Sequence, residues 1–219
     1  MQDNDARKLN QMFNRISNLI AAEKDYLTEL DGAIGDADHG ITMMLGFGAV
    51  ASELARSDFQ AMLPSTVMAT AASVFLNAVG ASTGPLYATA FLRAAKTLEA
   101  RQSLDAAGQV AMLQAITVGI QERGKGQRGD KTMLDTWIPA AEAGVAALQR
   151  ACGPVEFWRD VVAAGESGSI ATRSMVAVRG RAARLGERSL GHIDPGAASA
   201  VLILKAMSEV FSVRDSPEE

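Results

Sequence analysis

Apolar residues recur with the period of an α-helix along almost the whole of this 219-residue chain. Spacings of three and four residues place the first such set on one helix face. That set comprises Leu9, Met12, Phe13, Ile16, Leu19 and Ile20. Alanine is abundant and aromatic residues make up only 5%, which favours helices packed closely through small side chains. The apolar run 201–204 has the composition of a strand, but helical periodicity continues on both sides of it. We therefore predict an all-α protein.

About eight helices are expected, and most begin at a polar residue or a proline suited to a helix start. They start near Leu9, His39, Ser57–Asp58, Pro85, Ser103, Asp130, Pro154 and Asp194–Pro195. The second, third, fifth and sixth are expected to end near Ala55, Ala78, Arg123 and Arg150. The stretch from Glu23 to Asp38 breaks the helical pattern and is interpreted as a loop.

Connections rich in glycine and in polar or charged residues alternate with plainer ones along the chain. The informative connections are 31–40, 80–84, 124–130 and 180–196. In an antiparallel up-down array, alternate connections lie at the same end of the bundle. These four segments should therefore meet at one end. No linker or change of composition divides the chain, so we predict a single domain over 1–219 with a frayed tail over 214–219.

Charge and cysteine content exclude several classes of function. The net charge is −4 and the isoelectric point is near 5.3, which argues against a nucleic-acid-binding surface. Cys152 is the only cysteine, so no internal disulfide can form and a reducing compartment, the cytoplasm, is expected. The acidic N-terminus lacks the features of a secretion signal, and no apolar run is long enough to span a membrane.

Asp31, Asp36 and Asp38 form the aspartate cluster, which has no lysine or arginine inside it. Like charges this close repel each other unless a cation lies between them. Gly32 and Gly35 allow the tight curl that would bring the carboxylates together. A solvated acidic turn is the alternative. Carboxylates of this kind bind Mg²⁺ together with phosphates, so the cluster indicates phosphoryl chemistry on a Mg²⁺-bound nucleotide.

The other three connections have both structural and functional interpretations. The turn 80–84 indicates either a close helix crossing or a phosphate cradle with Ser82 and Thr83. The segment 124–132 superficially resembles a Walker loop, but an aspartate interrupts the motif and no strand precedes it. It is equally a nucleotide-covering loop or a plain surface loop. The four arginines of 179–188 form either a solvated charge run or a phosphate-binding loop.

Three long motifs resemble the dihydroxyacetone kinase L-subunit family. They are 27–40 (LTELDGAIGDADHG), 123–133 (RGKGQRGDKTM) and 180–196 (GRAARLGERSLGHIDPG), in the order and spacing of that family. The resemblance implies an antiparallel barrel of eight helices with the nucleotide at one end. Thr83 and Thr42 depart from the serine and asparagine that are usual in the family.

The resemblance also implies the site residues. Two Mg²⁺ ions would be bound by Asp31, Asp36 and Asp38. The ADP or ATP contacts would be His39, Gly40, Ile41, Thr42, Ser82, Thr83, Gly124, Met133, Arg181, Asp194, Pro195 and Gly196. No catalytic base is expected on this chain, because the acceptor should be activated on a partner subunit.

In this family the L subunit presents the γ-phosphate to dihydroxyacetone held by a K-type subunit. In the version linked to the phosphotransferase system, ADP stays bound and a phosphohistidine protein rephosphorylates it. We expect this version, in a homodimeric protein without a nucleic-acid or membrane partner. Alternatives are a subunit that uses free ATP or another acceptor (a different ketose or a fatty acid), a nucleotide-sensing subunit that binds a transcription regulator, and a Mg²⁺-dependent hydrolase or lyase.

Overall fold

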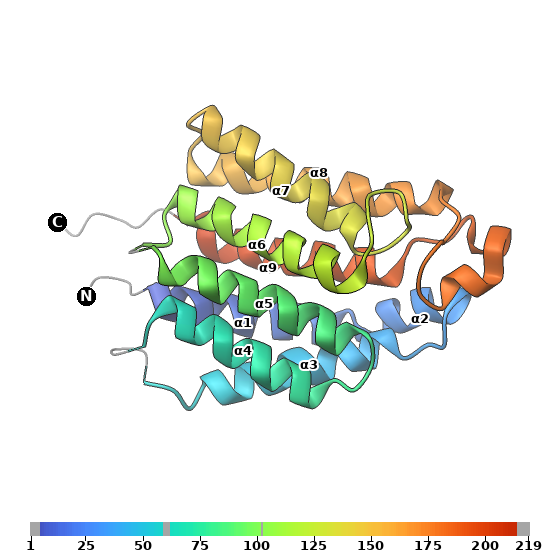
Figure 1. The fold of residues 1–219 in the computed structure, drawn as a ribbon, viewed down its shortest axis with the longest axis horizontal. Coiled ribbons are helices and arrows are strands. Elements are labelled where there is room, and N and C mark those ends of the chain that lie inside the picture. Colours follow the sequence, from blue (N-terminus) through green and yellow to red (C-terminus); the bar gives the residue numbers. More distant parts are fainter. Residues whose placement is uncertain (1–4, 59–61, 102, 214–219) are drawn as a thin grey trace.

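The computed structural model describes residues 5–58, 62–101 and 103–213, which contain nine α-helices, two 3₁₀ helices and no strand (Figure 1). The all-α class is therefore confirmed. None of these helices is both long and apolar enough to cross a bilayer. In chain order the helices are α1 (Asp5–Ala22), α2 (Lys24–Ile34), α3 (His39–Leu54), α4 (Pro64–Ala78), α5 (Thr83–Glu99), α6 (Ala106–Gly124), α7 (Leu134–Gln149), α8 (Pro154–Ala171), η1 (Thr172–Ser174), η2 (Ala182–Ser189) and α9 (Pro195–Phe211).

Eight of the α-helices pack side by side in a closed ring. Each of α3 to α8 contacts the next helix in the chain, and α1 closes the ring by contacting both α9 and α3. Figure 1 shows their axes running along the long direction of the molecule, with α2 beyond one end of α1. Five aromatic side chains pack mostly edge to face inside the ring. They are Phe13, Phe47, Phe75, Tyr87 and Phe91.

Small residues set the distance between several of these helices. A Cβ at Gly119 of α6 would lie 2.7 Å from the Cα of Ala90 in α5. A Cβ at Gly168 of α8 would lie 1.9 Å from the backbone oxygen of Asp135 in α7. These backbones touch because no side chain separates them, as the alanine-rich composition predicts.

The additional helix is α2, which occupies part of the stretch interpreted as a loop. Residues 24–34 are helical, and Leu27, Asp31 and Ile34 form their buried face. The estimate of about eight helices was therefore low by one. Asp31 lies in the last turn of a helix, so its position is set more firmly than that of a loop residue.

Several predicted helix starts are shifted. Ser57–Asp58 does not cap α4, which begins at Pro64. Helix α6 begins after Asp105, whose carboxylate accepts the N–H of Gly108, and not after Ser103. Helix α5 begins two residues before Pro85, at Thr83.

The last two helices begin as predicted. Helix α8 starts at Pro154. Helix α9 starts at Pro195, and the carboxylate of Asp194 accepts the N–H of Ala197 as its cap. The tail predicted over 214–219 lies outside the described residues.

Candidate functional site

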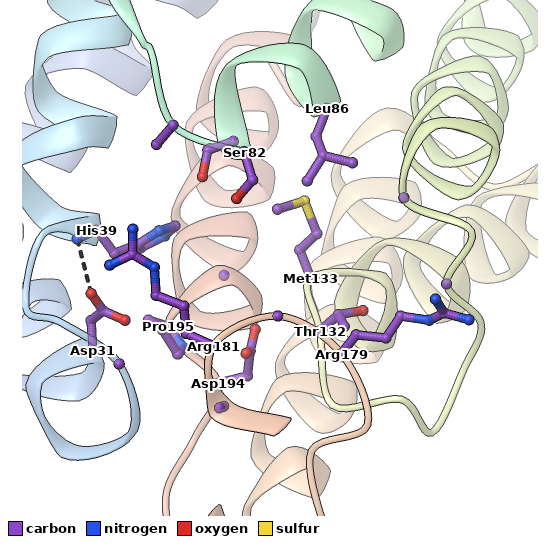
Figure 2. Close-up of a pocket in the computed structure, with 18 of the residues that line it drawn as sticks. Asp31, His39, Ser82, Leu86, Thr132, Met133, Arg179, Arg181, Asp194 and Pro195 are labelled. Atoms are coloured by element: carbon purple, nitrogen blue, oxygen red, sulfur yellow. Dashed lines mark hydrogen bonds between the residues drawn. The ribbon is translucent and has the colours of Figure 1, made fainter. Parts of the chain in front are cut away.

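A pocket of about 460 Å³ opens at one end of the helix ring (Figure 2). All four polar connections line it, together with the ends of the helices that they join. Alternation along the sequence therefore correctly placed these segments at a common end. The volume is in the range of small-molecule sites, which are usually few in a protein.

The aspartate cluster forms one side of this pocket. One carboxylate oxygen from each of Asp31, Asp36 and Asp38 lies within 4.8 Å of the other two. Asp31 is buried at the end of α2, whereas the other two lie in the turn before α3. Ala37, between them, adopts a left-handed conformation with φ of 61°. Such a conformation is uncommon for a residue with a side chain and is often found at functional sites.

Backbone hydrogen bonds hold the Asp31 carboxylate in place. Its Oδ2 accepts the N–H of Asp38 at 2.9 Å. It also accepts the N–H of His39 at 3.2 Å, the bond drawn in Figure 2. Gly35 lies against the same side chain, because a Cβ at this position would be 2.1 Å from Asp31 Oδ1. The turn thus folds tightly around one carboxylate and leaves the other two more exposed.

The electrostatics of the cluster favour a bound cation. Burial and the neighbouring charge of Asp31 raise the pKa of Asp38. Arg181 pairs with Asp36, and its Nη2 lies 3.9 Å from Oδ2 of Asp38. Three converging carboxylate oxygens fit Mg²⁺, which is commonly held by a few carboxylates and completed by water and phosphate.

His39 connects the aspartate cluster to α9. Its ring Nε2 lies 2.9 Å from Ser199 Oγ, and that hydroxyl donates to Gly196 O at 3.0 Å. Burial lowers the pKa of His39 to about 4, so the ring is neutral at pH 7. A neutral ring bonded to a serine orients the two helices and carries no charge to a ligand.

Three predicted nucleotide contacts do not line the pocket: Gly40, Ile41 and Thr42. A Cβ at Gly40 would lie 2.1 Å from Lys24 O, so this glycine permits the close packing of α3 on α2. Ile41 is 47% exposed, and the N–H of Thr42 is bonded to Asp38 O within the first turn of α3. Helical geometry turns these residues away from the pocket that His39 faces.

The start of α5 supplies hydrogen-bond donors to the pocket. Ser82 precedes the helix, and Thr83 is its first residue and is buried. Both line the pocket. The positive end of a helix dipole, reinforced by two hydroxyls, suits an anionic group such as phosphate.

An apolar wall faces the aspartate cluster across the pocket. It comprises Leu86, Ile120, Met133 and Leu134, from α5, α6 and the start of α7. In Figure 2, Leu86 and Met133 lie on the side opposite Asp31. The pocket therefore has an acidic side suited to Mg²⁺ and phosphates and an apolar wall suited to a nucleobase, with Thr132 and Arg179 on the same side as Met133.

Asp130 has a different role from the predicted helix cap. Its Oδ2 accepts Arg179 Nε at 2.6 Å and the N–H of Gln127 at 3.0 Å. Helix α7 begins only at Leu134. The carboxylate of Asp130 therefore pairs with Arg179, 49 residues further along the chain. This ion pair connects the segment 126–134 to the segment 179–188.

Asp194, Pro195 and Gly196 form the floor of the pocket at the start of α9. Burial raises the pKa of Asp194 to about 7, despite the favourable N–H of Ala197 and the charge of Lys131. Gly196 brings α9 close to the apolar wall, since a Cβ there would lie 3.5 Å from Met133 Cβ.

The structure brings most of the predicted site residues together. The three aspartates line the pocket, as do His39, Ser82, Thr83, Gly124, Met133, Arg181, Asp194, Pro195 and Gly196. Four lining residues with polar side chains are absent from the predicted set: Arg123, Lys131, Thr132 and Arg179. All four lie inside or beside the quoted motifs, but no local pattern separates a lining residue from its neighbours.

Comparisons with known proteins show which family this chain resembles. A family model described as the DAK2 domain matches residues 33–209. The chain is 39% identical to the PEP-dependent dihydroxyacetone kinase ADP-binding subunit DhaL of Escherichia coli, covering 89% of this chain and 91% of that protein. It is 36% identical to the PTS-dependent counterpart of Lactococcus lactis, covering 92% and 96%.

Longer relatives share this region only. The L-erythrulose 1-kinase of Mycolicibacterium smegmatis is 30% identical over 93% of this chain but 35% of its own length. The solved dihydroxyacetone kinase of C. freundii superimposes with a TM-score of 0.70 at 24% identity, covering 91% of this chain and 34% of that one. That similarity supports the fold.

Proposed function

This chain belongs to the DAK2 domain family, and from that membership we propose that it is the nucleotide-binding kinase subunit of a dihydroxyacetone kinase. The subunit would pass the γ-phosphate of a Mg²⁺-bound nucleotide to dihydroxyacetone held on a K-type partner. ADP would remain bound as a coenzyme and be rephosphorylated by a phosphohistidine protein of the phosphotransferase system. The relatives in E. coli and L. lactis are named as ADP-binding subunits of PEP- or PTS-dependent enzymes.

The degree of similarity favours the version of the family in which the nucleotide-binding subunit is named separately. Similarity to the E. coli subunit covers 91% of that protein, whereas similarity to L-erythrulose 1-kinase covers 35%. Relatives of the first kind are also the more similar, at 39% against 30% identity. We further propose a single domain, the eight-helix barrel of the family around this site, a cytoplasmic location and a homodimer.

The polarity of the pocket gives the nucleotide an orientation. Its base would lie against the apolar wall, and its phosphates would lie between the start of α5 and the aspartate cluster. Asp31, Asp36 and Asp38 would hold two Mg²⁺ ions, which neutralise the phosphate oxygens when bound. Arg181, already beside Asp36 and Asp38, would contact the same phosphates.

Positioning and charge neutralisation do most of the work in phosphoryl transfer. Burial lowers the pKa of His39 to about 4 and its Nε2 is bonded to Ser199, so the ring is a weak base for activating an acceptor hydroxyl. The K-type partner would therefore supply the base and hold the acceptor, and this chain would supply the oriented phosphoryl donor.

The observation that carries this proposal is the convergence of three carboxylates opposite a helix N-terminus and an apolar wall in one pocket. The direct test is isothermal calorimetry of ADP in Mg²⁺ with the variant Asp36→Ala. We expect Mg²⁺-dependent ADP binding to be lost, because the cluster would lose one of three ligands, while the helical circular dichroism remains unchanged.

The matched control is Asp25→Ala, which removes a carboxylate that is 92% exposed and paired with Lys24 on α2. It should bind ADP as the unsubstituted protein does. Unchanged ADP affinity in Asp36→Ala would remove the basis of the metal assignment.

A second candidate differs only in the acceptor. The similarity to L-erythrulose 1-kinase favours a four-carbon ketose as the alternative to dihydroxyacetone. Purification of the protein from its host with its bound partners, followed by phosphorylation assays with both ketoses, distinguishes the two.

A further inference from the structure

Lys131 is a buried cation whose bonds join two walls of the pocket. The residue is 1% exposed and has a left-handed backbone with φ of 59°. Its Nζ donates to Thr172 O at 2.7 Å and to His192 O at 2.6 Å. A fully buried lysine is rare, because removing its charge from water is unfavourable unless polar partners surround it. Its partners here are backbone carbonyls of two distant segments.

On one side, the ammonium group fixes the backbone that leads into α9. Thr172, which accepts one of the two bonds, also accepts the N–H of Asp194 at its hydroxyl, at 3.0 Å. His192, which accepts the other bond, lies two residues before Asp194. Both bonds therefore act on the segment that places Asp194, Pro195 and Gly196 in the pocket.

On the other side, Lys131 is held by the loop before α7. The carboxylate of Asp135 accepts the N–H of Gly129 at 2.6 Å and the N–H of Thr132 at 2.8 Å, on either side of Lys131. Thr132, Met133 and Leu134, which follow Lys131 directly, line the pocket. One side chain thus links the loop that leads into Met133 and Leu134 of the apolar wall to the segment that leads into α9.

We propose that Lys131 is a positioning residue that sets the spacing between the apolar wall and the start of α9, and so the affinity for the nucleoside part of the ligand. This inference rests on the proposed function, since it assumes that a nucleotide occupies the pocket. The aspartate cluster lies on α2 and in the turn before α3, and its hydrogen bonds to backbone N–H groups do not involve Lys131. Although Lys131 also lines the pocket, we therefore expect the phosphate end to depend on this residue less than the nucleoside end does.

The test compares two ligands in Mg²⁺ by calorimetry: ADP, and inorganic pyrophosphate, which lacks the nucleoside. In Lys131→Met we expect the dissociation constant of ADP to rise about tenfold, as for the loss of a hydrogen bond from a charged group. The dissociation constant of pyrophosphate should stay within about twofold of the original value, because the charged end is intact. Lys205→Met, the same substitution at an exposed lysine of α9, is the matched control and should change neither constant.

Thr172→Val provides a second variant if Lys131→Met does not fold. It removes the hydroxyl that accepts the Asp194 N–H and donates to Ser169 O, and leaves the Lys131 ammonium and its two carbonyl acceptors in place. It therefore tests the placement of the α9 start, which Lys131 is proposed to fix. Like Lys131→Met, it should raise the dissociation constant of ADP and leave that of pyrophosphate nearly unchanged.

The outcomes separate this inference from the proposed function. If Lys131→Met weakened the binding of ADP and of pyrophosphate equally, Lys131 would support the fold as a whole. If ADP binding were unchanged, Lys131 would not set the spacing. Either result overturns the inference. Failure of the unsubstituted protein to bind ADP or pyrophosphate in Mg²⁺ would instead contradict the proposed function.

Discussion

Gly35 is the residue on which the geometry of Asp31 depends most directly. A Cβ at this position would lie 2.1 Å from Asp31 Oδ1 and 2.9 Å from its Cγ, far inside van der Waals contact. Gly35→Ala must therefore displace the carboxylate and weaken its bonds to the N–H groups of Asp38 and His39. We expect the affinity for ADP in Mg²⁺, measured by calorimetry, to fall by about tenfold or more, because a small displacement of a binding group causes a large loss of binding free energy.

Gly48→Ala is the control for this substitution. Gly48 lies within α3, and a Cβ there would meet no atom within 4 Å. Alanine should stabilise the helix by about 0.5–1 kcal/mol and leave ADP binding unchanged. If both variants bound ADP equally well, Gly35 would not be shaping the Asp31 site.

Asp194 should make stability depend on pH in the protein without ligand. Burial raises its folded-state pKa to about 7, above the ordinary value of 3.8. The folded protein therefore holds this proton more tightly than the unfolded chain does, and the contribution to stability is lost as the pH rises between these values. Asp194→Asn keeps an oxygen that can cap α9 but cannot ionise.

The measurement is urea unfolding of both proteins in a chelator, from pH 4.5 to 7.5. The free energy of unfolding of Asp194→Asn should increase relative to the original protein as the pH rises, by up to about 1.4 kcal/mol per pH unit. Parallel stability curves would show that Asp194 is ionised in the folded protein throughout this range.

At the scale of the helices, sequence periodicity predicts helices whose buried positions are all apolar and misses a helix whose buried positions include a charged residue. The helix α1 was predicted because its inward positions are apolar. The periodicity of α2 does not predict a helix, because Asp31 occupies one of its three buried positions. A buried carboxylate interrupts the apolar pattern from which helices are recognised.

Asp194 and Asp130 show that a cap residue predicts a helix start only when its carboxylate has no distant partner. Asp194 caps α9 through the N–H of Ala197, three residues away. The carboxylate of Asp130 could cap a helix in the same way, but it accepts a hydrogen bond from Arg179, 49 residues further along the chain. Tertiary contacts of this kind override local propensity, and nothing in a single sequence reveals them.

The candidate site was predictable to a similar degree. Alternation of the connections placed four segments at one end, and the motif resemblance selected residues within them. The burial of Lys131 and its bonds to Thr172 and His192 were not predictable, because they depend on carbonyl groups that every residue carries.

For the whole molecule, the pocket joins segments that are far apart in the sequence. Residues from Asp31 to Gly196 line it, so the folded ring must be complete before a nucleotide can bind. A ligand that binds only the folded state raises its stability by mass action. ADP together with Mg²⁺ should therefore stabilise the entire ring, beyond the loops that it touches.

At ADP concentrations about 100 times its dissociation constant, the stabilisation should be about 2.7 kcal/mol, which corresponds to a rise of about 5–10 °C in Tm for a chain of this length. Differential scanning calorimetry with ADP and Mg²⁺ measures this rise in Tm. EDTA should abolish most of the rise, because the phosphates would then face the aspartate cluster without a cation. Asp36→Ala should show little rise under any of these conditions. An equal rise with ADP in Mg²⁺ and in EDTA would mean that the nucleotide binds without the metal, and that the three carboxylates serve another purpose.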